Sequence, residues 1–199
     1  MSENTRDQFI AAAQPLFAEK GFYGASIATI ARELGLTKQA LLHHFGNKEK
    51  LYGEVLRQIS DQLLGVTRGI LDSDRAPADK LVELVLAQYH AQVGDQDSAR
   101  LIMRELLDNE QRAEKAGNWY LKPYLEQLVD TAQAVESLGD LDRPRALALI
   151  YQLLGAAHYF AVSQPTLANM FGAPLMAQSR DVFEEELRTL IRCRLGRAA

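Results

Sequence analysis

Helical spacing of apolar residues along nearly the whole chain is the feature that most constrains its fold. In residues 9–17 apolar side chains recur at i, i+4, i+7 and i+8, and in residues 27–34 they recur at i, i+3, i+4 and i+7. Both patterns gather the apolar side chains on one face of a helix. The sequence has no strand-like alternation and no internal repeat, so it predicts an all-α protein.

Helix caps and glycines divide the first fifty residues finely. Ser26 can cap a helix over residues 27–34, after which Gly35 is a natural stop. Thr37 can cap a third helix that runs to about Phe45. These signals predict a compact unit of short helices near the N-terminus.

Longer helices are predicted beyond this unit, starting with one over residues 48–71. The apolar stripes place the others over residues 77–93, 99–107, 120–135, 143–162 and 179–195. Inside the first helix, Pro15 lacks a backbone donor and clashes with the preceding turn. We therefore expect a kink at Pro15, or a first helix whose regular part is short.

Residues 27–46 have the spacing of a helix-turn-helix. Two helices that cross steeply need a tight turn and a small residue at the crossing, which Gly35 and Ala31 supply. The side chains that the second helix would present outward are Lys38, Gln39, Leu42 and His43. Most of them are long or polar, as probing a DNA major groove requires. An ordinary helical hairpin has the same spacing, so spacing alone leaves both alternatives open.

Several short motifs around this segment resemble the TetR family of transcription regulators. In chain order they are Thr5-Arg6, residues 16–22, residues 26–31, Gly35-Leu36-Thr37-Lys38, His44-Phe45 and residues 48–51. The resemblance implies a three-helix, helix-turn-helix DNA-binding head over residues 1–50. It also implies a helical effector-binding and dimerisation domain over residues 51–199.

The resemblance implies DNA-binding roles for a set of head residues, namely Ser26, Thr37, Lys38, Gln39, Leu42, His43, His44 and Lys48. The two helix starts would hold phosphates, and the polar side chains of the third helix would reach base edges. Lys48 matches a family lysine that grips the DNA backbone, and His44 matches a histidine beside it. Leu42 stands where the family most often has a tyrosine that donates to phosphate. Leucine cannot donate, so it could touch a thymine methyl while His43 takes over the backbone contact.

By the same resemblance, two copies pair through their last two long helices and read a palindromic operator. The candidate contacts are apolar residues at helical spacing: Leu147, Tyr151, Leu154, Phe183, Leu187, Leu190 and Ile191. Each of them could instead belong to the core of a single protomer.

Aromatic and polar residues mix in the middle helices, which suits an apolar pocket with a few orienting groups. The candidate effector-binding residues are Tyr89, Met103, Trp119, Tyr120, Tyr124, His158, Tyr159 and Phe171. An ordinary core has the same mixture. The implied function is a repressor released by a small aromatic or amphipathic effector, and the alternative is a ligand-independent DNA-binding or nucleoid-structuring protein.

The charge distribution agrees with a DNA-binding head. The net charge of −4 comes from the body, because residues 1–50 hold six basic residues against five acidic ones. The sequence lacks a Gly-rich phosphate loop, a Gly-x-Ser-x-Gly elbow, His-Glu-x-x-His, Cys-x-x-Cys and Glu-x-x-His pairs. We therefore expect no catalytic residue, no metal site and no cofactor. The polar N-terminus and the shortness of the apolar stretch at 147–162 favour a cytoplasmic protein without a membrane span.

Overall fold

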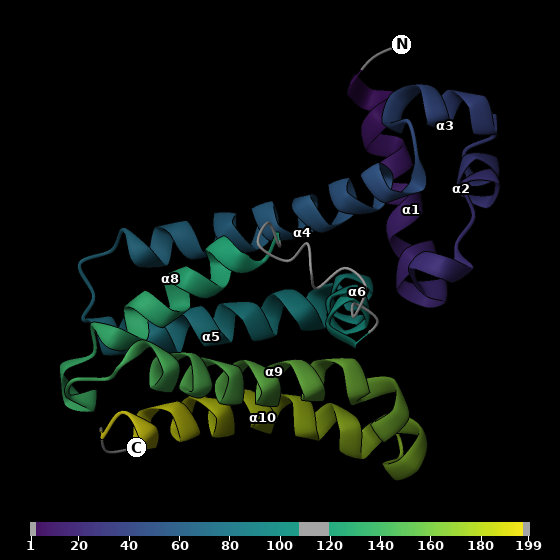
Figure 1. The fold of residues 1–199 in the computed structure, drawn as a ribbon. Helices are drawn as coiled ribbons and strands as arrows, with labels where there is room; N and C mark the ends of the chain where they lie inside the picture. Colours follow the sequence, from purple (N-terminus) through teal and green to yellow (C-terminus); the bar gives the residue numbers. More distant parts are fainter. Residues whose placement is uncertain (1–2, 108–119, 197–199) are drawn as a thin grey trace. The chain divides into compact units, whose positions relative to one another are not determined.

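A computed structural model of the chain describes residues 3–107 and 120–196, which are almost wholly helical (Figure 1). The elements are α1 (Glu3–Gly24), α2 (Ile27–Glu33), α3 (Lys38–Phe45), α4 (Lys48–Leu71), α5 (Pro77–Gly94), α6 (Gln96–Leu107), α8 (Lys122–Gln133), the 3₁₀ turn η2 (Glu136–Leu138), α9 (Arg143–Phe171) and α10 (Ala173–Arg194). No strand occurs within these described ranges, so the all-α prediction is confirmed.

The described residues group into two compact units. Unit 1 contains residues 3–62, the part of α6 that starts at Asp97, and Tyr120, while unit 2 contains residues 63–96 and 121–196. Helix α4 therefore supplies residues to both units. The predicted boundary at residue 50 divides a DNA-binding part from an effector-binding part. It does not coincide with the boundary between the two packed units, and it stays a prediction.

Short helices form in unit 1 where the caps predict them. The Thr29 N–H donates to Ser26 Oγ at 3.0 Å, which caps α2. The Ala40 N–H donates to Thr37 Oγ1 at 3.2 Å, which caps α3. Each cap satisfies a backbone donor that a helix start would otherwise leave unpaired, so both cap predictions are confirmed.

Helix α1 departs from the expectation at Pro15. It continues through Pro15, and its departure from helical backbone angles lies at Gly21, with φ 69° and ψ 177°. A positive φ costs glycine little, because glycine has no Cβ. The apolar stripe of α1 is buried at both Phe9 and Phe17, and this packing holds the helix together across the proline.

Helix α6 packs against α1 within unit 1, although about 80 residues separate them. The Arg104 guanidinium donates to Ala18 O and Glu19 O, both at 2.8 Å. Gln14 Nε2 donates to Ser98 Oγ at 3.1 Å. Arg104 thus satisfies carbonyl groups of α1 just before the break at Gly21, where helical partners run out.

A second contact ties α6 to α4. The Tyr52 hydroxyl donates to Glu105 Oε2 at 2.7 Å, and both side chains are buried. The Tyr52 ring also meets Phe17 and Phe22 edge-on, at centroid distances of 4.9 Å and 5.1 Å. Unit 1 is therefore a three-helix head completed by the start of α4 and by α6.

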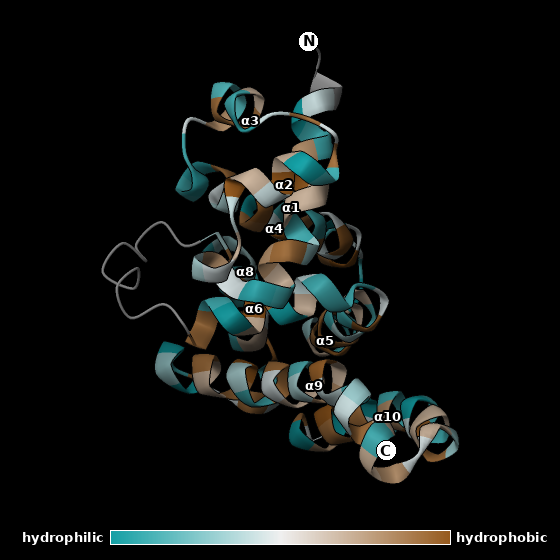
Figure 2. Ribbon diagram, turned by 90° about the vertical axis from the view of Figure 1, so that its right-hand side faces the viewer, coloured by the Kyte–Doolittle hydropathy of each residue, from teal (hydrophilic) through white to brown (hydrophobic). Residues whose placement is uncertain are grey.

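In unit 2, helix α9 packs against α5, α8 and α10, and α5 also contacts α8 and α10. Figure 2 shows apolar and polar bands alternating along α9, as expected of a helix with one buried face. The sequence predicts this helix only to residue 162, but it continues through the exposed Pro165 to Phe171. Phe160 of α9 and Phe183 of α10 stack with their ring centroids 3.9 Å apart.

Among the helices in the described part of the chain, α9 alone is long and apolar enough to cross a membrane, judged by length and composition. A core helix of a globular domain meets the same criteria. The packing of its buried stripe against α5, α8 and α10 accounts for part of its apolar character, while other apolar residues of the helix, such as Leu147 and Tyr159, are exposed.

Candidate nucleic-acid interface

Helices α2 and α3 are joined by the tight turn that a helix-turn-helix requires. Gly35 adopts φ +66°, and the Leu36 N–H donates back to Ala31 O at 2.9 Å. A side chain in this conformation would be strained, which explains the glycine. Ala31 is almost fully buried at the crossing, so the small residue stands where the sequence places it.

The two faces of α3 differ sharply in exposure. Leu41 and Phe45 are buried in unit 1 and anchor the inner face. Lys38, Gln39 and His43 are exposed on the helix. A rigid helix with an anchored inner face and a long, polar outer face has the form needed to enter a major groove.

The capping residues Ser26 and Thr37 are also exposed. Each hydroxyl oxygen already accepts a backbone N–H, and Ser26 Oγ also lies 2.9 Å from Thr29 Oγ1. A hydroxyl both donates and accepts. The Thr37 hydroxyl can therefore cap α3 and still donate to a phosphate oxygen.

His44 and Leu42 are partly withdrawn from the outer face. Both are half-buried, and the His44 ring lies 5.7 Å from the Phe9 ring, centroid to centroid. His44 Nε2 is enclosed without a hydrogen-bond partner among the described residues. His44 therefore packs against α1, whereas His43 is the histidine that solvent reaches, and a DNA-binding role for either stays a prediction.

Lys48 makes contacts inside unit 1 that the sequence does not reveal. Its ammonium donates to Ala25 O at 3.1 Å and lies 4.4 Å from the centroid of the Phe22 ring. These contacts tie the start of α4 to the α1–α2 connection. An ammonium has three donors, so Lys48 can hold this carbonyl and a phosphate at once.

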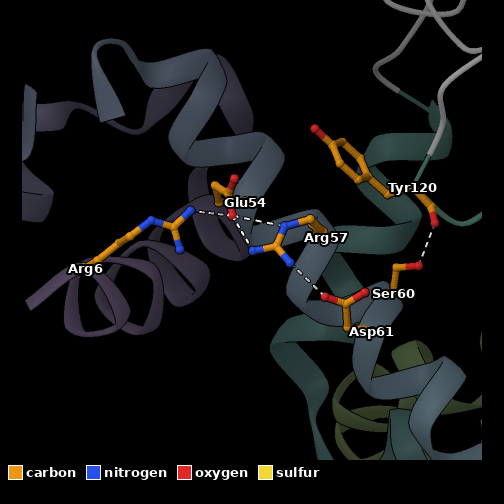
Figure 3. Close-up of polar contacts among 6 residues, drawn as sticks. All are labelled: Arg6, Glu54, Arg57, Ser60, Asp61 and Tyr120. Carbon is orange, nitrogen blue, oxygen red and sulfur yellow. Dashed lines mark hydrogen bonds and ion pairs between the residues drawn. The ribbon is translucent and has the colours of Figure 1, made fainter. Parts of the chain in front are cut away.

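An ion-pair network absent from the sequence predictions joins α1 to α4 (Figure 3). Glu54 accepts from Arg6 at 2.7 Å and from Arg57 at 2.6 Å, and Arg57 also donates to Asp61 at 2.9 Å. The Arg6 guanidinium lies 5.4 Å from the Phe45 ring centroid. The i, i+3 and i, i+4 spacing of the α4 charges is the signal that could have revealed part of the network.

The network controls the ionisation of Glu54. Partial burial raises the pKa of the Glu54 carboxyl, but hydrogen bonds and charges from Arg57 and Arg6 outweigh burial and hold the pKa below its ordinary value. Arg6, which follows Thr5 at the start of the chain, thereby links α1 and α4 beside the end of α3.

Tyr120 lies against α4 within unit 1 rather than in unit 2. Ser60 Oγ donates to Tyr120 O at 2.5 Å (Figure 3). A Cβ at Gly53 would lie 2.6 Å from the Tyr120 hydroxyl oxygen, so the absence of a side chain there allows the tyrosine to approach α4 closely. Met103 of α6 also belongs to unit 1.

The other predicted effector-binding residues are divided between the interior and the surface. Tyr89, Tyr124 and His158 are buried in unit 2. Tyr159 and Phe171 are 72% and 60% exposed on α9. Trp119 lies outside the described residues. Of the seven candidates that the structure describes, three are therefore buried in unit 2, and the effector-binding role of the set stays a prediction.

The predicted pairing residues divide in the same way. Leu147, Tyr151 and Leu190 are exposed, and Leu154 is half-buried. The remaining three pack within the protomer: Phe183 stacks on Phe160, and Leu187 and Ile191 are buried. Exposed apolar residues not predicted for this surface are Tyr159, Met170, Phe171, Leu175 and Val182. They were missed because helical spacing does not separate an inner from an outer apolar face.

Known proteins resemble this chain most clearly over its first helices. The sequence profile described as "Bacterial regulatory proteins, tetR family" matches residues 9–55. The HTH-type transcriptional repressor KstR2 of Mycolicibacterium smegmatis is 36% identical over 86 residues, which make up 43% of this chain and 42% of KstR2. The HTH-type transcriptional regulator UidR of Escherichia coli is 28% identical over 120 residues, or 60% of this chain and 61% of UidR. The matched region is thus less than half the length of KstR2.

Solved structures resemble the chain over nearly its whole length. The fatty acid degradation regulator FadR of Bacillus halodurans superimposes with a TM-score of 0.71 at 20% identity, covering 96% of each chain. FadR of Bacillus subtilis, in complex with stearoyl-CoA, gives a TM-score of 0.71 at 20% identity and covers 92% of this chain and 97% of its own. At such identities the likeness shows the fold. The helix-turn-helix geometry and the profile match over residues 9–55 support the TetR family of bacterial regulatory proteins, and the helical body has the fold of the solved regulators.

Proposed function

We propose that the protein is a transcriptional repressor that binds a palindromic DNA operator as a homodimer and is released by a small organic effector. The observation that carries the DNA-binding part is the exposed outer face of α3, with Lys38, Gln39 and His43, on a helix anchored by Leu41 and Phe45. In this proposal residues 1–50 read DNA, residues 51–199 sense and pair, and the protein acts in the cytoplasm without catalysis.

Local charge supports the proposed contact with DNA. Between Leu34 and Lys50 the chain has three lysines against the single acidic residue Glu49. The rest of the chain is acidic overall, and phosphates repel acidic surfaces. The segment around α3 is therefore the part that DNA attracts.

Exposed apolar residues on α9 and α10 support the proposed homodimer. Leu147 and Tyr151 of α9 and Leu190 of α10 are 43%, 48% and 52% exposed. Large apolar side chains exposed on two packed helices are typical of a surface that another molecule covers. The buried Leu187 and Ile191 would support this face from inside, and two copies would form a four-helix bundle.

Ligand-bound relatives support the proposed effector. FadR of Bacillus subtilis is described in complex with stearoyl-CoA, and a regulator of Saccharomonospora viridis with choline. Helix α4 supplies residues to both units, which gives a covalent connection between the sensing and the DNA-reading parts. A ligand that favours a conformation unsuited to DNA lowers the affinity for DNA. By linkage, bound DNA lowers the affinity for that ligand by the same factor.

Selection of bound sites from random duplex DNA, using the full chain, tests the DNA-binding and dimeric parts of the proposal together. A palindrome with two half-sites about one helical turn, or roughly 34–36 Å, apart is the expected result. Enrichment without any motif would favour a nucleoid-structuring protein instead.

Two substitutions then separate backbone contacts from base contacts. Lys48→Ala should weaken binding to all sequences and reduce the salt dependence by about one unit of slope, whereas Gln39→Ala should relax preference at one base pair. Lys122→Ala, which removes an exposed lysine of α8, is the matched control and should change neither. Identical effects of Lys48→Ala and Gln39→Ala would contradict the assigned roles.

A further inference from the structure

Tyr23 is a large aromatic residue that unit 1 leaves in contact with water. Among residues 5–62, Tyr23 and Leu36 are the exposed large apolar residues, and Tyr23 is the more exposed of the two, at 68%. It lies in the last turn of α1, two residues after the break at Gly21 and just before α2 (Figure 1). The Ala25 N–H donates to Gly21 O at 3.2 Å, which keeps this last turn closed.

The neighbouring Phe22 holds the Tyr23 ring in place. The two rings meet edge-on, with their centroids 5.2 Å apart. Phe22 is half-buried, and it meets the buried Tyr52 ring at a centroid distance of 5.1 Å. A tyrosine has only two side-chain torsions, so a ring that already packs at one edge loses little freedom when it binds a partner. Tyr23 is therefore an anchored aromatic residue that faces solvent over most of its surface.

The Lys48 ammonium reaches the same short segment from the start of α4. Its Nζ lies 4.4 Å from the Phe22 centroid and donates to Ala25 O at 3.1 Å. Tyr23 and Lys48 therefore both contact Phe22. The charges of one DNA strand recur about every 3.4 Å along the helix axis, so a strand held by Lys48 brings more than one phosphate to this segment.

Local charge favours a DNA backbone over a protein as the partner of this surface. Residues 19–30 contain one acidic and one basic side chain, Glu19 and Lys20, and Lys48 adds a positive charge. Phosphates are attracted to such a segment. An apolar protein surface that covered Tyr23 would have to remove the Lys48 ammonium from water without a charged partner, which is costly.

The chemistry of the side chain identifies the contact. Tyrosine hydroxyls are among the groups that donate hydrogen bonds to DNA phosphates. On α3 itself, Leu42 offers no donor. We infer that the Tyr23 hydroxyl donates to a phosphate of the DNA strand that Lys48 holds. The inference rests on the proposed DNA binding and adds a backbone-binding element, the last turn of α1, outside the helix-turn-helix.

Tyr23→Phe tests this contact, because it removes the hydroxyl and keeps the ring. The affinity for DNA should fall by about 2- to 12-fold, as expected for the loss of one hydrogen bond. A phosphate contact carries no sequence information, so the loss should be equal for a selected site and for a scrambled duplex of the same length. A hydroxyl releases no counterion, so the salt dependence should stay that of the wild type.

Fluorescence anisotropy with the full chain measures these affinities over a range of salt concentrations. Thr166→Val, which removes an exposed hydroxyl from α9 at similar shape, is the matched control and should bind DNA as the wild type does. The Tm of Tyr23→Phe should lie within about 2 °C of the wild-type value, because the hydroxyl is lost from an exposed side chain.

Modified DNA locates the contact by a second route. A methylphosphonate replaces one charged phosphate oxygen by a methyl group, and it is placed at successive positions of the selected site. At the phosphate that Tyr23 contacts, the modification should weaken binding by the wild type more than binding by Tyr23→Phe, since the two changes remove the same interaction.

Four results would overturn the inference. They are an unchanged affinity of Tyr23→Phe, a loss confined to the selected site, a clearly lower Tm, and equal effects of every methylphosphonate on the two proteins. Each of them leaves the proposed regulator intact, because the wild type still binds DNA. A wild type that binds no duplex would contradict the proposed function as well, so the two failures are distinguishable.

Discussion

Replacing Tyr52 by phenylalanine should measurably loosen the attachment of α6 to the DNA-binding unit. The substitution removes the hydroxyl that donates to Glu105 Oε2 at 2.7 Å but keeps the ring, which packs edge-on against Phe17 and Phe22. Hydrogen bonds to charged groups contribute about 1.5–3 kcal/mol. At about 2–4 °C per kcal/mol for a chain of this size, Tm should fall by about 3–12 °C.

Urea unfolding followed by circular dichroism measures this loss. Tyr159→Phe, at a tyrosine that is 72% exposed, is the matched control and should change the free energy of unfolding by less than about 0.5 kcal/mol. In a Glu105→Gln background the acceptor is uncharged, so Tyr52→Phe should there cost only about 0.5–1.5 kcal/mol. A Tyr52→Phe protein as stable as the control would refute the reasoning.

Three further predictions concern other parts of the molecule. Thr37→Ala removes the cap of α3 and should lower the free energy of unfolding by about 1 kcal/mol, whereas Thr37→Ser should retain most of it in the same urea titration. Because the folded pKa of Glu54 is lowered, its network stabilises the protein above the ordinary glutamate pKa of about 4.3 and loses this effect as the pH falls through the folded value. The advantage of the wild type over Glu54→Gln, measured by Tm, should therefore be full at neutral pH and vanish in strong acid. Leu190→Glu places a charge on the exposed face of α10 and should halve the mass measured by light scattering, while the same change at the exposed Leu36, outside that face, should not.

Each of these three has a result that would count against it. Equal stability of Thr37→Ala and the wild type would mean that the cap is dispensable. A pH-independent difference at Glu54 would mean that the carboxylate charge is not what the two arginines stabilise. An unchanged mass for Leu190→Glu would mean that two copies pair through a different surface.

Local chemistry explains what the sequence predicts well. Ser26, Thr37 and Gly35 act on backbone groups within a few residues of themselves, so their roles follow from the sequence around them. The anchored inner face of α3 follows in the same way from the spacing of Leu41 and Phe45.

Contacts between distant segments explain what the sequence does not reveal. Arg104 reaches carbonyl groups 85 and 86 residues earlier in the chain, and no local period records such a contact. The carbonyl partner of Lys48 is likewise set by the path of the α1–α2 connection. Apolar spacing predicts the same pairing role for Leu187 and Leu190, although Leu187 is buried within the protomer and Leu190 is exposed. The continuation of α9 past Pro165 is likewise not recorded in local spacing, because a proline inside a helix removes one backbone hydrogen bond and usually marks a helix end.

The membership of α6 in unit 1 also bears on how the protein is made. Domains at the N-terminus generally fold first as a chain leaves the ribosome. Here the groups of α6 that bind Gln14, Ala18 and Tyr52 are absent until residues 98–105 have been synthesised. The N-terminal helices are therefore translated first but completed later, and a nascent chain that stalls between α4 and α6 carries an unfinished DNA-reading end.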